Sequence, residues 1–294
     1  MHPRWRRCSS FKYSRYSQSS CLARGAPRRP RCNAGLSPRA VKGAACAILI
    51  GIVCVGTSHA AQRSRPAPRK ELLVPFVVGE TLTYDVSWST YLTAGTATIH
   101  VADKKPSYDS VAYYIVAEGR PTALVSKIYS LYYKVDTLLD SYTLLPQRGS
   151  VYSEEGKRHR MKTTMFDHAK RRAEYQVETR TVVKKALTVS AVSQDPLGAL
   201  YVLRSIPLKQ GEKITMPICD GGVSYRILVQ AGAIDTIKTA AGTFQAQQLS
   251  VTPPADVGAR ALSLWLTNDA ARVPVKMSAQ LPVGTFVLTL ASRR

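Results

Sequence analysis

The chain has 294 residues, of which 45% are hydrophobic, and it carries a formal net charge of +22. This length and hydrophobic content exclude a disordered chain and predict one or two globular domains. The charge is uneven, because residues 1–42 contain 11 Lys and Arg residues and the first acidic residue is Glu71.

Residues 44–56, with the sequence AACAILIGIVCVG, form an uncharged apolar segment just before Ser58 and Ala60. The segment has the length of a signal-peptide hydrophobic region and is shorter than the roughly 20 residues that a membrane-spanning helix needs. Ser58 and Ala60 occupy the small-residue positions of a signal-peptidase site, so we expect cleavage after Ala60, with Ala61 as the alternative. These features predict an exported, periplasmic protein that is soluble after cleavage and has no transmembrane helix in its mature form.

Residues 1–60 are interpreted as a basic leader plus a signal peptide, although the basic part is longer than such regions usually are. A true translation start at Val41 would leave a signal peptide of ordinary shape. The alternatives are a long but genuine basic region and a nucleic-acid-binding arm. Export argues against nucleic acid as a partner of the mature protein.

Cleavage leaves 30 basic and 19 acidic residues, a net charge of +11, and Cys219 as the single cysteine. One cysteine forms no intramolecular disulfide. Cys54 follows Gly-Ile-Val rather than the residues that precede the modified cysteine of a lipoprotein, so we expect no lipid anchor.

Residues 61–74 begin as a polar, basic, proline-containing segment and are predicted to be a flexible linker, whereas residues 75–294 are predicted to be a single β-rich exported domain. From Thr81 the chain alternates between polar residues and the apolar residues Leu82, Tyr84, Val86 and Trp88. This period of two predicts a half-buried strand. Further strands are predicted at 96–101, 111–117, 147–153, 158–166, 172–178, 182–191, 213–218, 223–230, 243–251, 261–267, 273–280 and 284–291.

The segment PTALVSKIYSLYYK breaks this alternation and is predicted to be helical. Thr122 is a suitable N-cap, and the following apolar residues share one helical stripe: Leu124, Val125, Ile128 and Tyr132.

The segment SQDPLGALYVLRSIP is the second predicted helix. Asp195 suits the N-cap, and Pro196 suits the first helical position, where no backbone N–H is needed. Arg204 favours the last turn because of the helix dipole, and Pro207 stops the helix.

About a dozen closely spaced strands are joined by short turns such as CDGG at 219–222 and AAGT at 240–243. Connections this short imply antiparallel neighbours, since parallel crossovers need a dozen or more residues each. We therefore predict a mainly β fold, in which a long curved antiparallel sheet forms an open or closed barrel-like shape wrapped on one or two helices. Such a shape can enclose an apolar cavity.

The sequence contains no recognisable catalytic or metal-binding motif. His100, His159 and His168 lie in separate segments of the mature chain, and no HExxH, GxSxG or Gly-rich phosphate loop occurs. Cys219 lacks the neighbouring histidine or helix N-terminus that activates a thiol and is interpreted as a turn residue. We therefore predict no catalytic residue, metal or cofactor.

Aromatic residues on the apolar faces of different strands are the candidate ligand-binding residues, although they can equally fill a core. They are Tyr84, Trp88, Tyr113 and Tyr225. A fifth candidate, Trp265, begins the segment WLTNDAARVPVKM, which reads as a hairpin with Asn268 and Asp269 in its turn and Arg272 paired with Asp269 across the tip. Trp265 falls on the face opposite Leu264 and Leu266. The pattern does not decide whether the Trp265 face meets solvent, core or groove.

Basic stretches at 156–162 and 170–180 alternate charged and apolar residues at strand spacing. They are interpreted as a solvated outer face of the sheet, where charges discourage edge aggregation. Attraction to anionic partners, such as lipid headgroups or acidic cell-wall polymers, is the functional alternative.

The order of PFVVGETLTYDVSWSTYLTAGTATIHV, QDPLGALYVLRSIPLKQGEKITMPICDGGVSYRILV and LWLTNDAARVPVKMSAQLPVGTFVLTL resembles exported bacterial proteins grouped as domain of unknown function 3108, from Pro75 to about Leu290. The resemblance implies a β-rich envelope protein with no established activity. The terminal hairpin is also similar to that of periplasmic lipoprotein carriers. That similarity implies an unclosed barrel wrapped on helices, with a hydrophobic groove.

These features lead to a first hypothesis of a non-enzymatic periplasmic protein that binds a hydrophobic or amphiphilic envelope component. A structural or assembly factor that docks through its basic face on an acidic envelope polymer or protein is the alternative. An envelope-polymer hydrolase is the third hypothesis, with Asp85, Asp140, Asp195 and Asp269 as candidate carboxylates.

Overall fold

A computed structural model of the chain describes residues 69–294 with gaps at 89–91, 129–130, 258–259 and 282–283. The described residues all belong to one compact unit that spans residues 65–294. The predicted leader, the Val41 start and the cleavage site after Ala60 lie outside the described residues.

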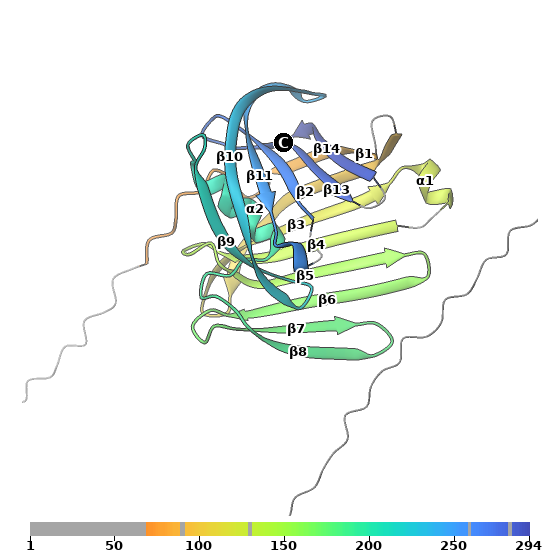
Figure 1. Ribbon diagram of the computed structural model, residues 1–294. Coiled ribbons are helices and arrows are strands. Elements are labelled where there is room, and N and C mark those ends of the chain that lie inside the picture. The colour runs from red at the N-terminus through yellow and green to blue at the C-terminus, as the bar shows by residue number, and fades with distance from the viewer. Residues whose placement is uncertain (1–68, 89–91, 129–130, 258–259, 282–283) are drawn as a thin grey trace, which may run out of the picture. The chain divides into compact units, whose positions relative to one another are not determined.

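The described part of the chain is dominated by strands (Figure 1). They are β1 (Thr81–Trp88), β2 (Leu92–Ser107), β3 (Ser110–Pro121), β4 (Leu131–Asp140), β5 (Pro146–Glu155), β6 (Arg158–Asp167), β7 (Arg172–Glu178), β8 (Val182–Thr188), β9 (Lys213–Asp220), β10 (Val223–Thr239), β11 (Gly242–Thr252), β12 (Leu262–Thr267), β13 (Pro274–Leu281) and β14 (Gly284–Arg293). The helices are α1 (Ala123–Ile128), α2 (Pro196–Ser205) and the short 3-10 helix η1 (Ala255–Val257).

All described strands belong to one antiparallel sheet in the order β8-β7-β6-β5-β4-β3-β2-β1-β14-β13-β12-β11-β10-β9. Nearly every strand pairs with its neighbour in sequence, and the chain crosses over once, from β8 through α2 to β9. The sheet curls around α2, which contacts both β4 and β9 (Figure 1). The mainly β, barrel-like fold expected from the sequence is confirmed, and the sheet is open because β8 and β9 are its two edges.

The two edges approach each other at the β9–β10 turn. There the Lys185 Nζ donates a hydrogen bond to the Gly222 carbonyl over 2.9 Å. Gly222 has a φ of +79°, and a Cβ at this position would lie 2.7 Å from the Tyr175 ring. Only glycine suits both the positive φ and the close approach of the Tyr175 ring. The predicted turn at 219–222 therefore also packs one edge of the sheet against the other.

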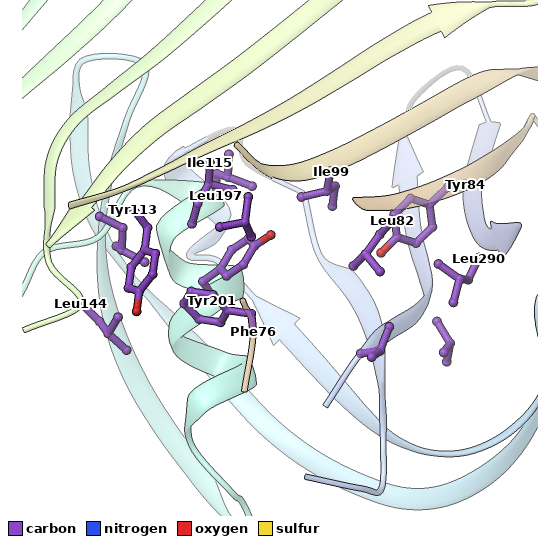
Figure 2. Packing of buried hydrophobic residues seen from close by; sticks show 14 of the residues in the cluster. Phe76, Leu82, Tyr84, Ile99, Tyr113, Ile115, Leu144, Leu197, Tyr201 and Leu290 are labelled. Carbon is purple, nitrogen blue, oxygen red and sulfur yellow. The ribbon is translucent and has the colours of Figure 1, made fainter. Parts of the chain in front are cut away.

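Helix α2 packs against two hydrophobic clusters, one on each half of the curled sheet. Figure 2 shows the first, in which Leu197 and Tyr201 of the helix lie beside Phe76, Tyr113 and Ile115. The second cluster contains Ala199 and Leu203 together with strand residues Met216, Ile218, Ile227, Val229, Leu249, Leu264 and Leu266. A single short helix therefore contributes buried side chains to both clusters.

The predicted start of α2 is confirmed. Asp195 is the N-cap, and its Oδ1 accepts a 2.8 Å hydrogen bond from the Gly198 amide. Pro196 follows at the start of the helix. The Asp195 Oδ2 also accepts a 2.6 Å hydrogen bond from Thr137 of β4, which attaches the cap to the sheet.

Arg204, in the last turn of α2, is fully buried. Its Nη1 and Nη2 donate to the two carboxylate oxygens of Glu80 over 2.6 and 3.1 Å. The same guanidinium donates to the carbonyls of Ala271 and Arg272. The end of α2 is therefore joined to the start of β1 and to the β12–β13 hairpin by one group.

The hairpin at 265–277 has the expected turn, but its predicted Asp269–Arg272 side-chain pair is wrong. The Asp269 Oδ1 accepts hydrogen bonds from the backbone amides of Ala271 and Arg272, both over 3.0 Å. The Arg272 guanidinium instead donates to the carbonyl of Leu203 in α2. The Asp269 carboxylate therefore stabilises the turn itself, and the Arg272 side chain attaches the hairpin to α2.

The predicted helix after Thr122 is wrong in length. Helix α1 ends at Ile128, and Tyr132 lies in β4, which the sequence did not predict. Residues 131–140 have β-branched and aromatic residues suited to a strand, and pairing with β3 and β5 on both sides outweighs the helical stripe.

The end of the predicted linker at 61–74 contacts the sheet. The Leu72 amide donates to the Ser141 carbonyl over 3.1 Å, and Glu71 pairs with Lys104. Val74 packs on the first hydrophobic cluster.

Candidate functional site

An apolar groove of about 210 Å³ lies between α2 and the half of the sheet formed by β9–β13. The helix contributes Pro196, Ala199, Leu200 and Leu203, a spacing of three and four residues that places them on one face. The other lining residues are Ile218, Tyr225, Ile227, Val251, Pro253, Arg260, Leu262, Leu264 and Met277.

The sheet side of the groove follows from the strand period. Tyr225 and Ile227 of β10, and Leu262 and Leu264 of β12, are two residues apart, so each pair points to the same face of the sheet. Leu264 and Ile227 are buried, whereas Leu262 is 38% exposed. The groove is therefore deepest beside the second hydrophobic cluster and opens at Leu262.

Two lining residues, Tyr225 and Arg260, carry polar side chains; the others are aliphatic, proline or methionine. Burial raises the pKa of Tyr225 to about 12, so its phenol is neutral at physiological pH. Arg260 is exposed at the rim. The ion pairs formed among the described residues do not involve it. The site thus offers an apolar wall and one cation at its opening.

One of the five aromatic candidates, Tyr225, lines this groove. Tyr84 and Tyr113 belong to the first hydrophobic cluster. The Tyr84 hydroxyl donates to the Pro274 carbonyl over 2.8 Å, and Tyr113 packs edge-on against Phe76. Both rings fill the core that lies on another side of α2 (Figure 2).

The two tryptophans lie elsewhere. Trp88, 39% exposed at the end of β1, is stacked with Phe286 of β14. Trp265 is half-buried, its Nε1 donates to Asp235 over 3.3 Å, and the Lys276 Nζ lies 4.7 Å from its ring centroid. The structure therefore does not bring the five candidates together in one cavity.

Most of the groove residues are small aliphatic side chains that sequence reasoning did not single out. The signal that points to them is the α2 stripe at 196, 199, 200 and 203, which continues beyond the residues needed to pack one face of the sheet. The strand residues carry no such signal, because core and groove residues share the same alternation.

Nucleophilic and metal-binding chemistry finds little support in the described part of the chain. Cys219 lies in β9 next to the turn rather than in it, and burial raises the pKa of its thiol to about 11. His168 has both ring nitrogens within hydrogen-bonding distance of the carbonyls of Pro146 and Ala191. Across the residues described, no three His, Cys, Asp or Glu side chains gather as a possible metal site.

The basic stretches at 156–162 and 170–180 lie on β6 and β7 and in the turns that flank these strands. Within these stretches Lys170 pairs with Asp167 and His159 lies near Glu154, whereas on the next strand, β8, Lys184 pairs with Glu174 of β7. In the described residues, no helix has both the length and the hydropathy needed to span a bilayer.

Comparison with known proteins matches the chain to a protein family. A family model described as "Protein of unknown function (DUF3108)" matches residues 83–291. The match covers every strand that lines the groove, as well as α2. A search of curated proteins found no significant match.

Solved structures with a similar arrangement have low sequence identity to this chain. A β-barrel-like protein of domain of unknown function DUF1849 from Brucella abortus has 9% identity and a TM-score of 0.47, with 74% of this chain and 97% of that chain covered. A protein from Bacteroides fragilis, described as exported and YmcC-like in fold, has 12% identity and a TM-score of 0.31, with 76% and 100% covered. A protein from Parabacteroides distasonis described as a lipoprotein has 9% identity and a TM-score of 0.30, with 76% and 100% covered.

Proposed function

The chain belongs to the family described as protein of unknown function DUF3108, and from this premise we propose that it is a non-enzymatic envelope protein that binds an amphiphile in the α2 groove. One observation carries the proposal: an apolar groove has a single exposed arginine at its opening. An alkyl chain would lie along Leu200, Leu264 and Met277, and an anionic headgroup would be held by Arg260.

The size of the groove narrows the ligand class. Its volume of about 210 Å³ is below the roughly 300–1,000 Å³ of common small-molecule pockets. A single alkyl chain suits this volume better than a multi-chain lipid. We therefore expect a single-chain amphiphile with a carboxylate or phosphate headgroup.

The cell envelope is proposed as the place of action because of the sequence of residues 44–60, which has the features of a signal peptide. The groove supports binding better than catalysis, since its described lining offers Tyr225 and Arg260 as the polar groups. Docking through the basic face is the second candidate, because Lys170 pairs with Asp167 whereas the ion pairs among the described residues do not involve the other lysines and arginines of the two basic stretches.

Filling the groove from its rim is expected to weaken ligand binding strongly. We expect Leu262→Trp to weaken binding of dansyl-undecanoic acid at least tenfold, because the indole would occupy the space of the alkyl chain. Leu262 is 38% exposed, so the larger side chain can be accommodated without disturbing the core. Fluorescence titration measures the dissociation constant.

Leu228→Trp is the matched control, because Leu228 is 40% exposed on β10 and does not line the groove. It should bind the probe as the parent does. Equal affinity of the parent and Leu262→Trp, or failure of the parent to bind any single-chain amphiphile, would refute the proposed site.

The headgroup contact is tested separately by Arg260→Gln. We expect the affinity for the carboxylate probe to fall about fivefold, equivalent to ~1 kcal/mol for an exposed ion pair, and the loss to shrink at high salt. Affinity for the corresponding alcohol should stay the same. Arg158→Gln, which removes an exposed arginine on β6, is the control; an equal loss in both variants would mean that Arg260 makes no specific contact.

A further inference from the structure

A second apolar hollow of about 550 Å³ lies beside the C-terminal half of α2, away from the proposed ligand groove. It is bounded by the segment before β1, by the start of β9 and by residues 143–145. Five aliphatic residues form what we call the end patch: Leu72, Leu73, Val192, Ile206 and Ile214. Val202 of α2 and Ile206, the C-cap that follows the helix, line this hollow, whereas Ala199 and Leu203 line the groove.

Three of the five end-patch side chains are unusually open to solvent for aliphatic residues, whereas Ile206 and Ile214 are half-buried. Leu73 is 93% exposed, Val192 56% and Leu72 44%. The backbone that carries them is held in place, since the Leu72 amide donates to the Ser141 carbonyl. Glu71 is fixed as well, by pairing with Lys104 and accepting a hydrogen bond from Ser141. Leu72 and Leu73 therefore point outward from a segment of chain that is attached to the sheet.

Basic residues accompany the patch. Arg69 and Lys70 lie three and two residues before Leu72, and Lys213 directly precedes Ile214; all three are exposed. Lys209 is exposed on the turn that leads from α2 to β9. The acidic residues of the same segments are Glu71, which is neutralised by Lys104, and Glu212. The surroundings of the patch are therefore net positive.

We propose that the end patch docks the protein on the surface of an anionic phospholipid bilayer. Leu73 and Val192 would enter the boundary between headgroups and acyl chains, and the lysines would contact the headgroups. A bilayer fits better than a protein partner, because lysine is depleted in protein interfaces, whereas aliphatic side chains bordered by lysine and arginine are typical of membrane-surface binding. The proposal goes beyond the ligand groove, because it involves a different surface of α2.

Vesicle co-sedimentation tests the proposal with the chain from Ala61 onward, which contains the whole compact unit of residues 65–294. The vesicles contain phosphatidylglycerol and phosphatidylcholine in equal parts, or phosphatidylcholine alone. We expect the parent to bind the anionic vesicles at low salt and to bind the neutral vesicles much more weakly. Leu73→Glu should reduce the partition coefficient at least tenfold, because it replaces the inserted side chain with a charge that the vesicle repels.

Val183→Glu is the matched control, since Val183 is a 60% exposed aliphatic residue on β8, outside the patch. It adds the same negative charge and should reduce binding much less than Leu73→Glu. Lys213→Glu should weaken binding at low salt and lose its effect at high salt. No binding of the parent to anionic vesicles, or equal losses in Leu73→Glu and Val183→Glu, would overturn the proposal.

The vesicle assay also separates this proposal from the groove. Leu262→Trp leaves the end patch unchanged and should sediment with anionic vesicles as the parent does. If Leu262→Trp loses vesicle binding while Leu73→Glu retains it, the membrane contact is made by the groove rim and the end patch is rejected.

Discussion

Replacing Arg204 with methionine is expected to lower the free energy of unfolding by about 3–5 kcal/mol, the usual cost of removing one partner of a buried ion pair. The Arg204 side chain has 0% and the Glu80 side chain 2% of its surface exposed. The substitution leaves the Glu80 carboxylate buried with one remaining partner, Arg293, at 3.3 Å. The carbonyls of Ala271 and Arg272 also lose their donor. Urea denaturation followed by circular dichroism measures the loss.

The double variant Arg204→Met, Glu80→Leu shows whether the cost comes from the unpaired charge. We expect it to be more stable than Arg204→Met alone, because two apolar side chains replace the pair. Arg172→Met, at an exposed site on β7, should change stability by less than about 0.5 kcal/mol. If Arg204→Met also lowered the free energy of unfolding by less than about 0.5 kcal/mol, the contacts of Arg204 with Glu80 and the hairpin carbonyls would add nothing to stability.

A second large effect is expected from pH acting on Asp195. Burial raises the pKa of this carboxyl to about 6 from its ordinary 3.8, despite the hydrogen bonds from Gly198 and Thr137. The folded chain therefore holds the proton more tightly than the unfolded chain. The tighter proton binding adds to the free energy of unfolding below pH 4. This addition, about 3 kcal/mol in all, is lost as the pH rises from about 4 to 6.

Asp195→Asn removes the titration and keeps a side-chain oxygen for the helix cap. We expect the stability of the parent, relative to this variant, to fall as the pH rises from 4 to 6.5, measured by urea denaturation at each pH. Asp167→Asn should show the opposite sign, because the hydrogen bond from Lys170 holds the pKa of Asp167 below its ordinary value. Parallel curves for the parent and Asp195→Asn would show that the carboxyl titrates at its ordinary pKa.

The sequence predicted α2 well because its signals are local. An N-cap aspartate, a proline at the first position and a proline beyond the end act within a few residues of the helix termini, and the structure has the helix there. Most strands were likewise predicted from their period of two. Strand β4 was missed because Tyr132 also fits the helical stripe that begins at Leu124, and pairing with β3 and β5 decides between the two.

The structure separates the aromatic candidates that the sequence grouped together. Tyr225 lines the groove, whereas Tyr84 and Tyr113 pack in the core. Alternation shows which face of a strand is apolar. It does not show whether that face meets a helix, another side chain or an opening, because this depends on how far the sheet curls around α2.

The sequence by itself determined most of the elements, the antiparallel order expected from short connections, and the basic character of the chain. These follow from local backbone preferences and from composition, which are properties of neighbouring residues. Only the tertiary structure decided the partners of Arg204, whose carboxylate lies 124 residues away in Glu80. It also decided the groove, whose wall combines α2 with strands from β9 to β13. Contacts between residues far apart in the chain depend on the curvature and register of the whole sheet, which no local pattern of residues records.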